Sequence, residues 1–189
     1  EQITDLAVAA VVASGGLIPL LRSAASWWSR KRHEKGLRSI RRIYSNINTL
    51  SNALDANRVA ILDVCNGGHA PKAGSKLTIQ TVYEISAIET PCGRTIGATK
   101  TPVDPDLLDR IIKLSDGDPH SWATVDMPDG TLRLLAESMD SDKVVMHRVG
   151  VDVACTKVLA VFMPTDSELT PRQEQLLWDT SCFLRTLRW

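Results

Sequence analysis

Cys65 and His69 lie four residues apart, and a thiol near an imidazole is a pattern typical of a nucleophile with its base. Catalysis of this kind also needs a group that orients the imidazole and donors that hold an oxyanion. The sequence around the pair supplies neither. We therefore predict no catalytic residue, and we interpret Cys65 as a buried thiol and His69 as a loop residue.

The turn Asn66, Gly67 and Gly68 is followed by His69 and Lys72, so backbone amides and cations come close together in the sequence. Such a group can hold a phosphate or another small anion. However, no helix starts directly after the turn, and the spacing is not that of a P-loop. A plain strand-ending turn is the main interpretation, and a ligand loop at these five residues is the alternative.

Other metal and cofactor patterns are weak. The cysteines stand singly, without zinc-site spacing, at Cys65, Cys92, Cys155 and Cys182. We predict that they are reduced, with Cys65 and Cys155 as small apolar residues inside strands. The acids Asp104, Asp106 and Asp109 begin a helix, where they favour its dipole without a metal. We expect no metal and no cofactor.

The N-terminal residues 1–36 form an arm that is first apolar and then basic. Residues 6–21 carry no charge, and with the next tryptophans they supply the predicted membrane or assembly contacts Leu6, Val8, Val11, Val12, Leu17, Ile18, Leu21, Trp27 and Trp28. The basic residues that follow are predicted to meet an anionic surface: Arg30, Lys31, Arg32 and Lys35.

Two interpretations of the apolar stretch remain open. A short membrane span, with tryptophans at the interface and basic residues beyond, would leave the body on the cytoplasmic side. A helix buried in an oligomer or a larger assembly fits equally, because small residues at four-residue spacing let helices approach closely. Sixteen apolar residues are marginal for a span, which needs about 20.

The remainder of the chain has the composition of one folded domain. The full chain has 189 residues, 43% of them hydrophobic and 23% charged, which excludes a disordered protein. Residues 1–57 hold eight Lys or Arg against four Asp or Glu, while the net charge is zero. A basic arm therefore precedes a mildly acidic body, and nucleic-acid binding is not favoured because the body lacks a matching basic stripe.

Periodicity and capping signals predict the elements that would position these residues. A long amphipathic helix from Leu37 precedes strands over residues 58–66 and 77–88, then a helix capped by Asp104. Residues 122–127 and 131–138 are predicted as a hairpin across Pro128, Asp129 and Gly130. Strands over 143–151 and 155–163 precede a last helix with a Thr170 capping box. The fold class is α+β, an antiparallel sheet whose one face the terminal helices cover.

This order, with the segment from Asn52 to Gly68 and the late strand from Lys157 to Pro164, resembles the GAF domain family over residues 37–189. The resemblance implies a GAF-like sheet and either small-molecule binding, as of cyclic nucleotides or tetrapyrroles, or a dimerising signalling role. Residues 127–142 depart from the family pattern, since a short hairpin there would not cover a pocket. The segments Asn66 to Gly68 and Tyr83 to Glu84 also resemble uncharacterised phage proteins.

The leading functional expectation is a non-enzymatic structural or assembly protein, anchored by its arm in a membrane or a large oligomer such as a virion. Its partners would be further copies of itself and other assembly proteins. The alternative is a membrane-tethered GAF-type sensor of a small ligand, whose arm again serves as the anchor. We expect Trp122, Trp178 and Trp189 to be core or interface anchors rather than parts of a ligand cage.

Overall fold

The computed structural model describes residues 29, 31–66, 76–87, 100–114, 119–151, 155–166 and 168–187. The predicted contacts from Leu6 to Trp28, together with Arg30, Gly67, Gly68, His69 and Lys72, lie outside these residues. Contacts divide the chain into one unit over Glu1–Arg42 and a second over Ile43–Trp189, which we call the body. A helix over residues 31–54 supplies its residues 43–54 to the body. No helix in the described ranges is both long and apolar enough to cross a bilayer.

The body contains an antiparallel sheet of order β3-β2-β1-β6-β5-β4 among its described residues. The strands and helices follow in the chain as β1 (Arg58–Cys65), β2 (Thr78–Ser86), β3 (Thr101–Pro102), α2 (Pro105–Lys113), β4 (His120–Ala123), the 3-10 turn η1 (Thr124–Asp126), α3 (Thr131–Ser138), β5 (Lys143–Val151), β6 (Cys155–Met163) and α4 (Pro171–Arg185). The predicted strands before and after residue 153 are confirmed, and the first strand ends one residue early.

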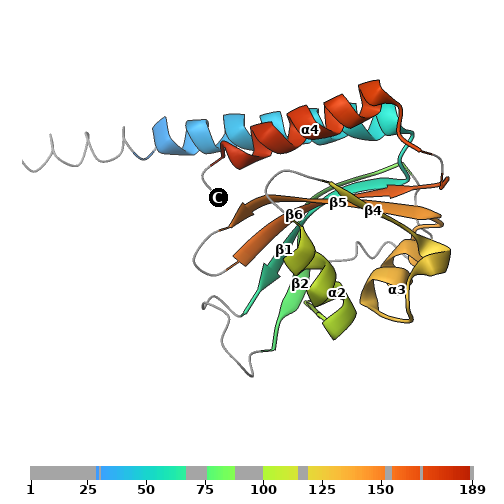
Figure 1. Cartoon of the computed structure of the whole chain (residues 1–189). Coiled ribbons are helices and arrows are strands. Elements are labelled where there is room, and N and C mark those ends of the chain that lie inside the picture. Colours follow the sequence, from blue (N-terminus) through green and yellow to red (C-terminus); the bar gives the residue numbers. More distant parts are fainter. Residues whose placement is uncertain are drawn as a thin grey trace, which may run out of the picture. The chain divides into compact units, whose positions relative to one another are not determined.

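Helices cover both faces of this sheet (Figure 1). Residues 43–54 of the first helix and α4 bury Ile47, Leu50, Leu177 and Leu184 on one face, which we call the α4 face. On the other face, the α2 face, side chains of α2 and α3 pack on alternate residues of β1, including Leu62. Every residue of β1 is buried as a result. The expectation that the terminal helices cover one face is confirmed, and α2 and α3 cover the other.

The predicted hairpin over residues 122–138 is also wrong. Residues 131–138 form α3, which buries Leu132, Leu135 and Ala136 toward the sheet. These residues recur at the spacing of a helix rather than that of a strand. The segment 127–142 thus supplies a helix that covers the sheet, and the expectation of a short hairpin in this segment is corrected.

Distant residues hold α3 at both ends. At its start, the Thr131 N–H donates to Oδ2 of Asp104 (2.5 Å), while Oδ1 of Asp104 accepts from the Leu107 N–H (2.8 Å) and caps α2 as predicted. At its end, Nδ2 of Asn57 donates to the carbonyl oxygens of Met139 (3.0 Å) and Asp140 (2.8 Å). One carboxylate therefore joins both helices that cover the α2 face.

The last helix begins as predicted. Thr170 and Gln173 form the reciprocal capping box, with Pro171 at the first helical position. The register between β1 and β2 shifts by one residue between Ile61 and Leu62 of β1. Tyr83 and Ile79 of β2 therefore lie on opposite faces of the sheet. The simple alternation along this strand does not predict that change.

The close approach at Gly130 gives a stability prediction. A Cβ at Gly130 would lie 2.9 Å from Oδ2 of Asp104, which is held by the α3 amide. We expect Gly130→Ala to lower the free energy of unfolding by about 1–2 kcal/mol, since the cap must shift. Gly36→Ala is the matched control, because nothing lies within 4 Å of its Cβ and alanine favours a helix by up to about 1 kcal/mol. Urea unfolding of both variants measures this, and equal midpoints would contradict it.

Candidate functional site

A cation and two aromatic rings meet where α2 passes β4. The guanidinium carbon of Arg110 lies 5.1 Å from the ring centroid of Trp122, and the Trp122 ring stacks with His120 at 5.9 Å between centroids. Arg110 also donates from Nε to Oδ2 of Asp106 (2.7 Å). We call His120, Trp122 and Arg110 the α2 triad.

Local sequence explains why these side chains meet. Pro105 and the Asp104 cap start α2, which buries Leu107 and Ile111 and brings Arg110 to the border of the buried face. β4 pairs with β5 through His120 opposite Met146 and Trp122 opposite Val144. Because alternate residues of a strand share a face, His120 and Trp122 point to the same side of the sheet. Trp122 packs against the core, as expected, and keeps part of its ring exposed.

The triad has the chemistry to hold a flat anion. Two π faces can stack on a planar group, and a guanidinium can pair with a carboxylate or phosphate. Arg110 is mostly buried, with 12% of its side chain exposed, so its charge acts in a partly desolvated place. Arg110 donates to Asp106 through Nε, so its two Nη groups can donate hydrogen bonds to a ligand.

A second triad of the same residue types lies on the α4 face. Arg185 lies over Trp178 at 5.8 Å, and Trp178 stacks with His147 at 5.8 Å. Here the guanidinium is already used, because Arg185 donates to the carbonyl oxygen of Arg148 from Nε and Nη2 and contacts Nε2 of His147 at 2.9 Å. His147 is fully buried. This second group, which we call the α4 triad, fixes α4 on β5.

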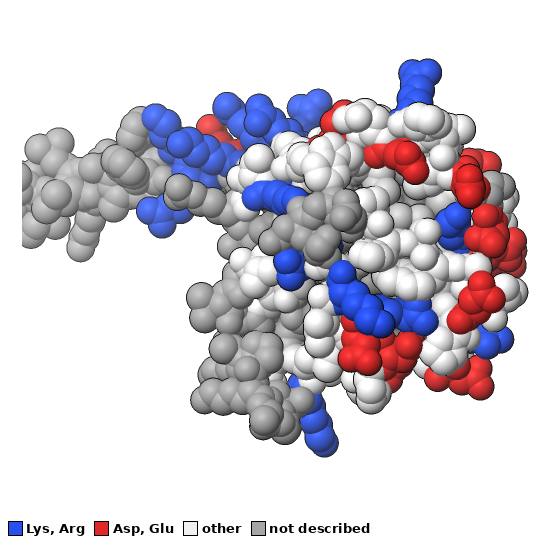
Figure 2. Space-filling model, in the orientation of Figure 1, with Lys and Arg blue, Asp and Glu red and all other residues white. Residues whose placement is uncertain are grey.

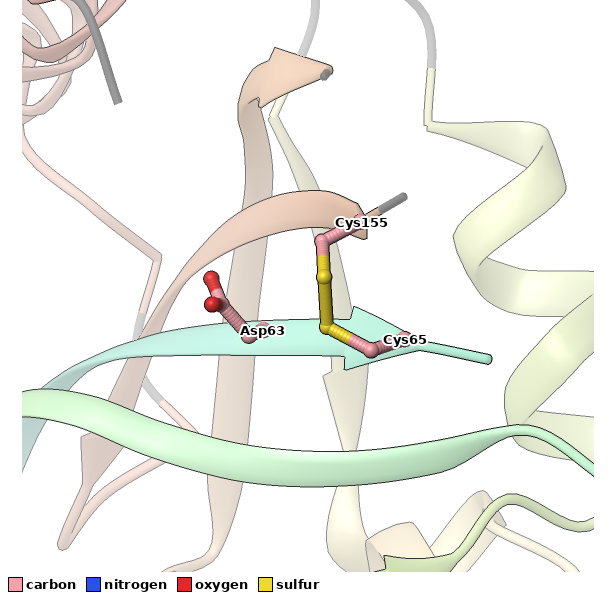
Figure 3. Close-up of side chains that lie close together, drawn as sticks. All are labelled: Asp63, Cys65 and Cys155. Carbon is pink, nitrogen blue, oxygen red and sulfur yellow. A yellow bond between two sulfur atoms is a disulfide. The ribbon is translucent and has the colours of Figure 1, made fainter. Parts of the chain in front are cut away.

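A polar cluster lies at the opposite end of β1 from Arg58, also on the α4 face. Nζ of Lys157 donates to Oδ1 of Asp63 (2.6 Å), and both residues are buried. Cys65 and Cys155 form a disulfide two residue pairs further along the strands (Figure 3). Burial, then Tyr44 and then Asp63 raise the pKa of the Tyr83 hydroxyl nearby.

The disulfide corrects the expectation of reduced cysteines. Cys65 and Cys155 are directly opposite in the antiparallel pairing of β1 and β6, with Cα atoms 4.4 Å apart, so their sulfurs meet across the ladder. The two residues are separated by 90 positions, which hides this pairing from sequence spacing. Among the described cysteines, Cys182 is free.

Of the sequence-predicted ligand loop, the structure describes only Asn66, which is half-buried and directly follows β1. Of the predicted anionic-surface contacts, it describes Lys31, Arg32 and Lys35, which are all exposed on the helix over residues 31–54. Lys and Arg side chains gather on this part of the helix, whereas acidic side chains gather on the body (Figure 2). The stretch from Leu6 to Trp28 lies outside the described residues, so its role as a membrane or assembly anchor stays a prediction.

Two hollows lined by described residues lie away from the α2 triad. One, of about 760 Å³, lies between residues 49–53 of the first helix and the start of α4, including Leu176. The other, of about 330 Å³, is lined by residues that include Lys143, Glu168 and Glu174. Both are open at the surface and neither contains an aromatic ring, so the triad is the better candidate for a planar ligand.

The structural comparisons identify the fold as GAF-like. A GAF domain of a sensor histidine kinase from Bacillus halodurans matches with a TM-score of 0.52 at 12% identity, over 75% of this chain and 89% of that one. A far-red cyanobacteriochrome photoreceptor matches at 0.51 and 14%, over 83% and 93%. A phycoerythrobilin-bound GAF domain from a cyanobacterial phytochrome matches at 0.50 and 11%, over 77% and 89%. No family model and no curated protein sequence matches this chain.

These findings correct the leading functional expectation. The solved structures that share the fold belong to a sensor kinase and to photoreceptors, so the structural, assembly or virion role predicted from the sequence is wrong. The resemblance to phage proteins finds no support. The GAF-like fold itself is confirmed.

The double cap at Asp104 predicts a pH dependence. Burial by itself would raise the pKa of this carboxyl, but hydrogen bonds from the Leu107 and Thr131 amides outweigh burial and lower the pKa. Because the folded pKa lies below the ordinary value of about 3.9, this stabilisation is present above that value and is lost as the pH falls through the folded pKa.

Asp104→Asn tests the cap, since an amide offers one acceptor oxygen where the carboxylate uses two. We expect the variant to lose about 1–3 kcal/mol of unfolding free energy at pH 7. The difference from the unmodified protein should shrink below pH 4, measured by urea unfolding across a pH series. A difference that stays constant down to pH 2 would contradict the role of the ionised carboxylate.

Proposed function

We propose that the body is a non-catalytic sensor domain that binds a small, planar, anionic ligand at the α2 triad. The observation that carries this proposal is the position of Arg110 over Trp122, whose ring also stacks with His120, at the border of the face that α2 and α3 cover. A cation beside stacked rings suits a ligand with a flat π system and a carboxylate or phosphate.

The structural neighbours support the class of function. They are described as a sensor kinase domain and photoreceptors, and one of them carries phycoerythrobilin. The α3 helix adds a second support, because a helix rather than the expected short hairpin packs on the α2 face. Since α3 itself has no cysteine, we propose that the ligand is held without a covalent thioether at this helix.

Thermal unfolding with candidate ligands tests the proposal. A cyclic nucleotide and a linear tetrapyrrole both combine a flat π system with anionic groups, and they are the first probes. A ligand at 100 times its Kd stabilises by about 2.7 kcal/mol, which raises the midpoint of a domain of this size by roughly 5–10 °C.

Arg110→Gln should abolish that rise while leaving the ligand-free midpoint within a few degrees. Arg185→Gln is the matched control, because it removes a guanidinium from the same arrangement over Trp178 on the opposite face and should keep the ligand effect. Equal loss in both variants, or equal retention in both, would contradict a binding site at the α2 triad.

We further propose that residues 6–21 tether the sensor to a membrane, supported by their uncharged sequence and by the exposed Lys31, Arg32 and Lys35 that follow. The full chain should float with vesicles that contain phosphatidylserine, whereas a chain lacking residues 1–36 should stay unbound. Light scattering on the same samples measures self-association, the other predicted use of this stretch. Equal flotation of both chains would contradict the tether.

A further inference from the structure

The Cys65–Cys155 disulfide lies beside the carboxylate of Asp63, and a disulfide that only joins two strands needs no carboxylate next to it. A ligand atom of Asp63 and the two sulfurs all lie within 4.8 Å of one another. In Figure 3 the Asp63 side chain stands next to the sulfur bridge, on the same side of β1 as Cys65. This agrees with the two-residue spacing along the strand.

We propose that this cluster is a redox-gated site for a thiophilic divalent cation, with Zn²⁺ as the expected ion. In the oxidised protein the two sulfurs are bonded to each other and bind no cation. In the reduced protein, Cys65, Cys155 and Asp63 supply two thiolates and one carboxylate, which leaves one position of a tetrahedral zinc site for water.

The strand register makes the reduced geometry accessible. Zn–S bonds of about 2.3 Å place the two sulfurs of a tetrahedral site roughly 3.8 Å apart, further than in a disulfide but within the reach of directly opposed side chains. The pairing of Cys65 with Cys155, and of Asp63 with Lys157, is held by the ladder of β1 and β6 rather than by the sulfur bridge alone. The three donors therefore stay together after reduction.

Charge balance favours a divalent cation. Cys65 is 9% exposed and Asp63 is 8% exposed, so an excess of negative charge here would be costly. Two thiolates and the carboxylate carry three negative charges, which Lys157 and a divalent cation balance. Without the cation, the thiols would have to stay protonated. Thiolate ligands also select zinc over magnesium or calcium.

The gating step needs a dithiol reductant, and the atoms balance. One reductant thiolate attacks a sulfur of the bridge, so the S–S bond breaks and a mixed disulfide forms; the second reductant thiolate then attacks this mixed disulfide and displaces the protein cysteine as a thiolate. The reductant leaves as its own disulfide after giving two electrons, and Cys65 and Cys155 become thiols. Each thiol releases one proton as its Zn–S bond forms. Cys155 is only partly buried, which gives the reductant access.

Cobalt(II) is the optical probe for this site, because a thiolate–cobalt bond absorbs in the near ultraviolet. The test uses the full chain with Cys92→Ser and Cys182→Ser, so that the pair in the sheet supplies its remaining cysteines. The protein is reduced with dithiothreitol, desalted without oxygen and titrated with cobalt chloride. We expect one cobalt per chain, with an absorption band that zinc removes, and no band in the oxidised protein.

Asp63→Asn in the same background should weaken cobalt binding by at least about tenfold, and Cys155→Ser should remove most of the band. Circular dichroism checks the fold of each variant. If a variant unfolds, the comparison of oxidised and reduced protein in the parent background still decides. No band after reduction, an equal band in the oxidised protein, or unchanged affinity in a folded Asp63→Asn protein would overturn the proposal.

Discussion

The burial of β1 on both faces is the constraint on which the remaining structure depends. All eight of its residues are buried, including Arg58 and Asp63. A strand of this kind needs a helical layer on each side and a partner for every polar side chain. The first helix and α4 form one layer, while α2 and α3 form the other. Glu84 pairs with Arg58, and Lys157 pairs with Asp63.

The helices of the second layer, α2 and α3, are short, so their stability depends strongly on the capping of their ends. An eight-residue helix such as α3 has little stability by itself in water. Asp104 satisfies its first amide, and Asn57 satisfies carbonyl oxygens at its end. Both partners lie far from α3 in the sequence. The helix therefore forms because distant residues cap its ends and because Leu132 and Leu135 are buried against the sheet.

This explains what the sequence could predict and what it could not. The strands β5 and β6 and the starts of α2 and α4 are encoded locally, by β-branched runs and by caps within three residues such as Thr170 with Gln173. The helix α3 and the disulfide depend on partners 27 and 90 residues away. Likewise, nothing near Trp122 in the sequence indicates that Arg110 lies over its ring, because the contact needs α2 to pack across β4.

The two triads show why residue types alone do not define a site. Arg185, Trp178 and His147 repeat the chemistry of the α2 triad, yet the guanidinium of Arg185 is committed to a backbone carbonyl and the imidazole is enclosed. Arg110 instead keeps donors in reserve at the border of a covered face. Because β1 sends alternate side chains to the two faces, the core beneath α2 and the cluster at Asp63 share one strand. The full ladder with β6 holds that strand in register.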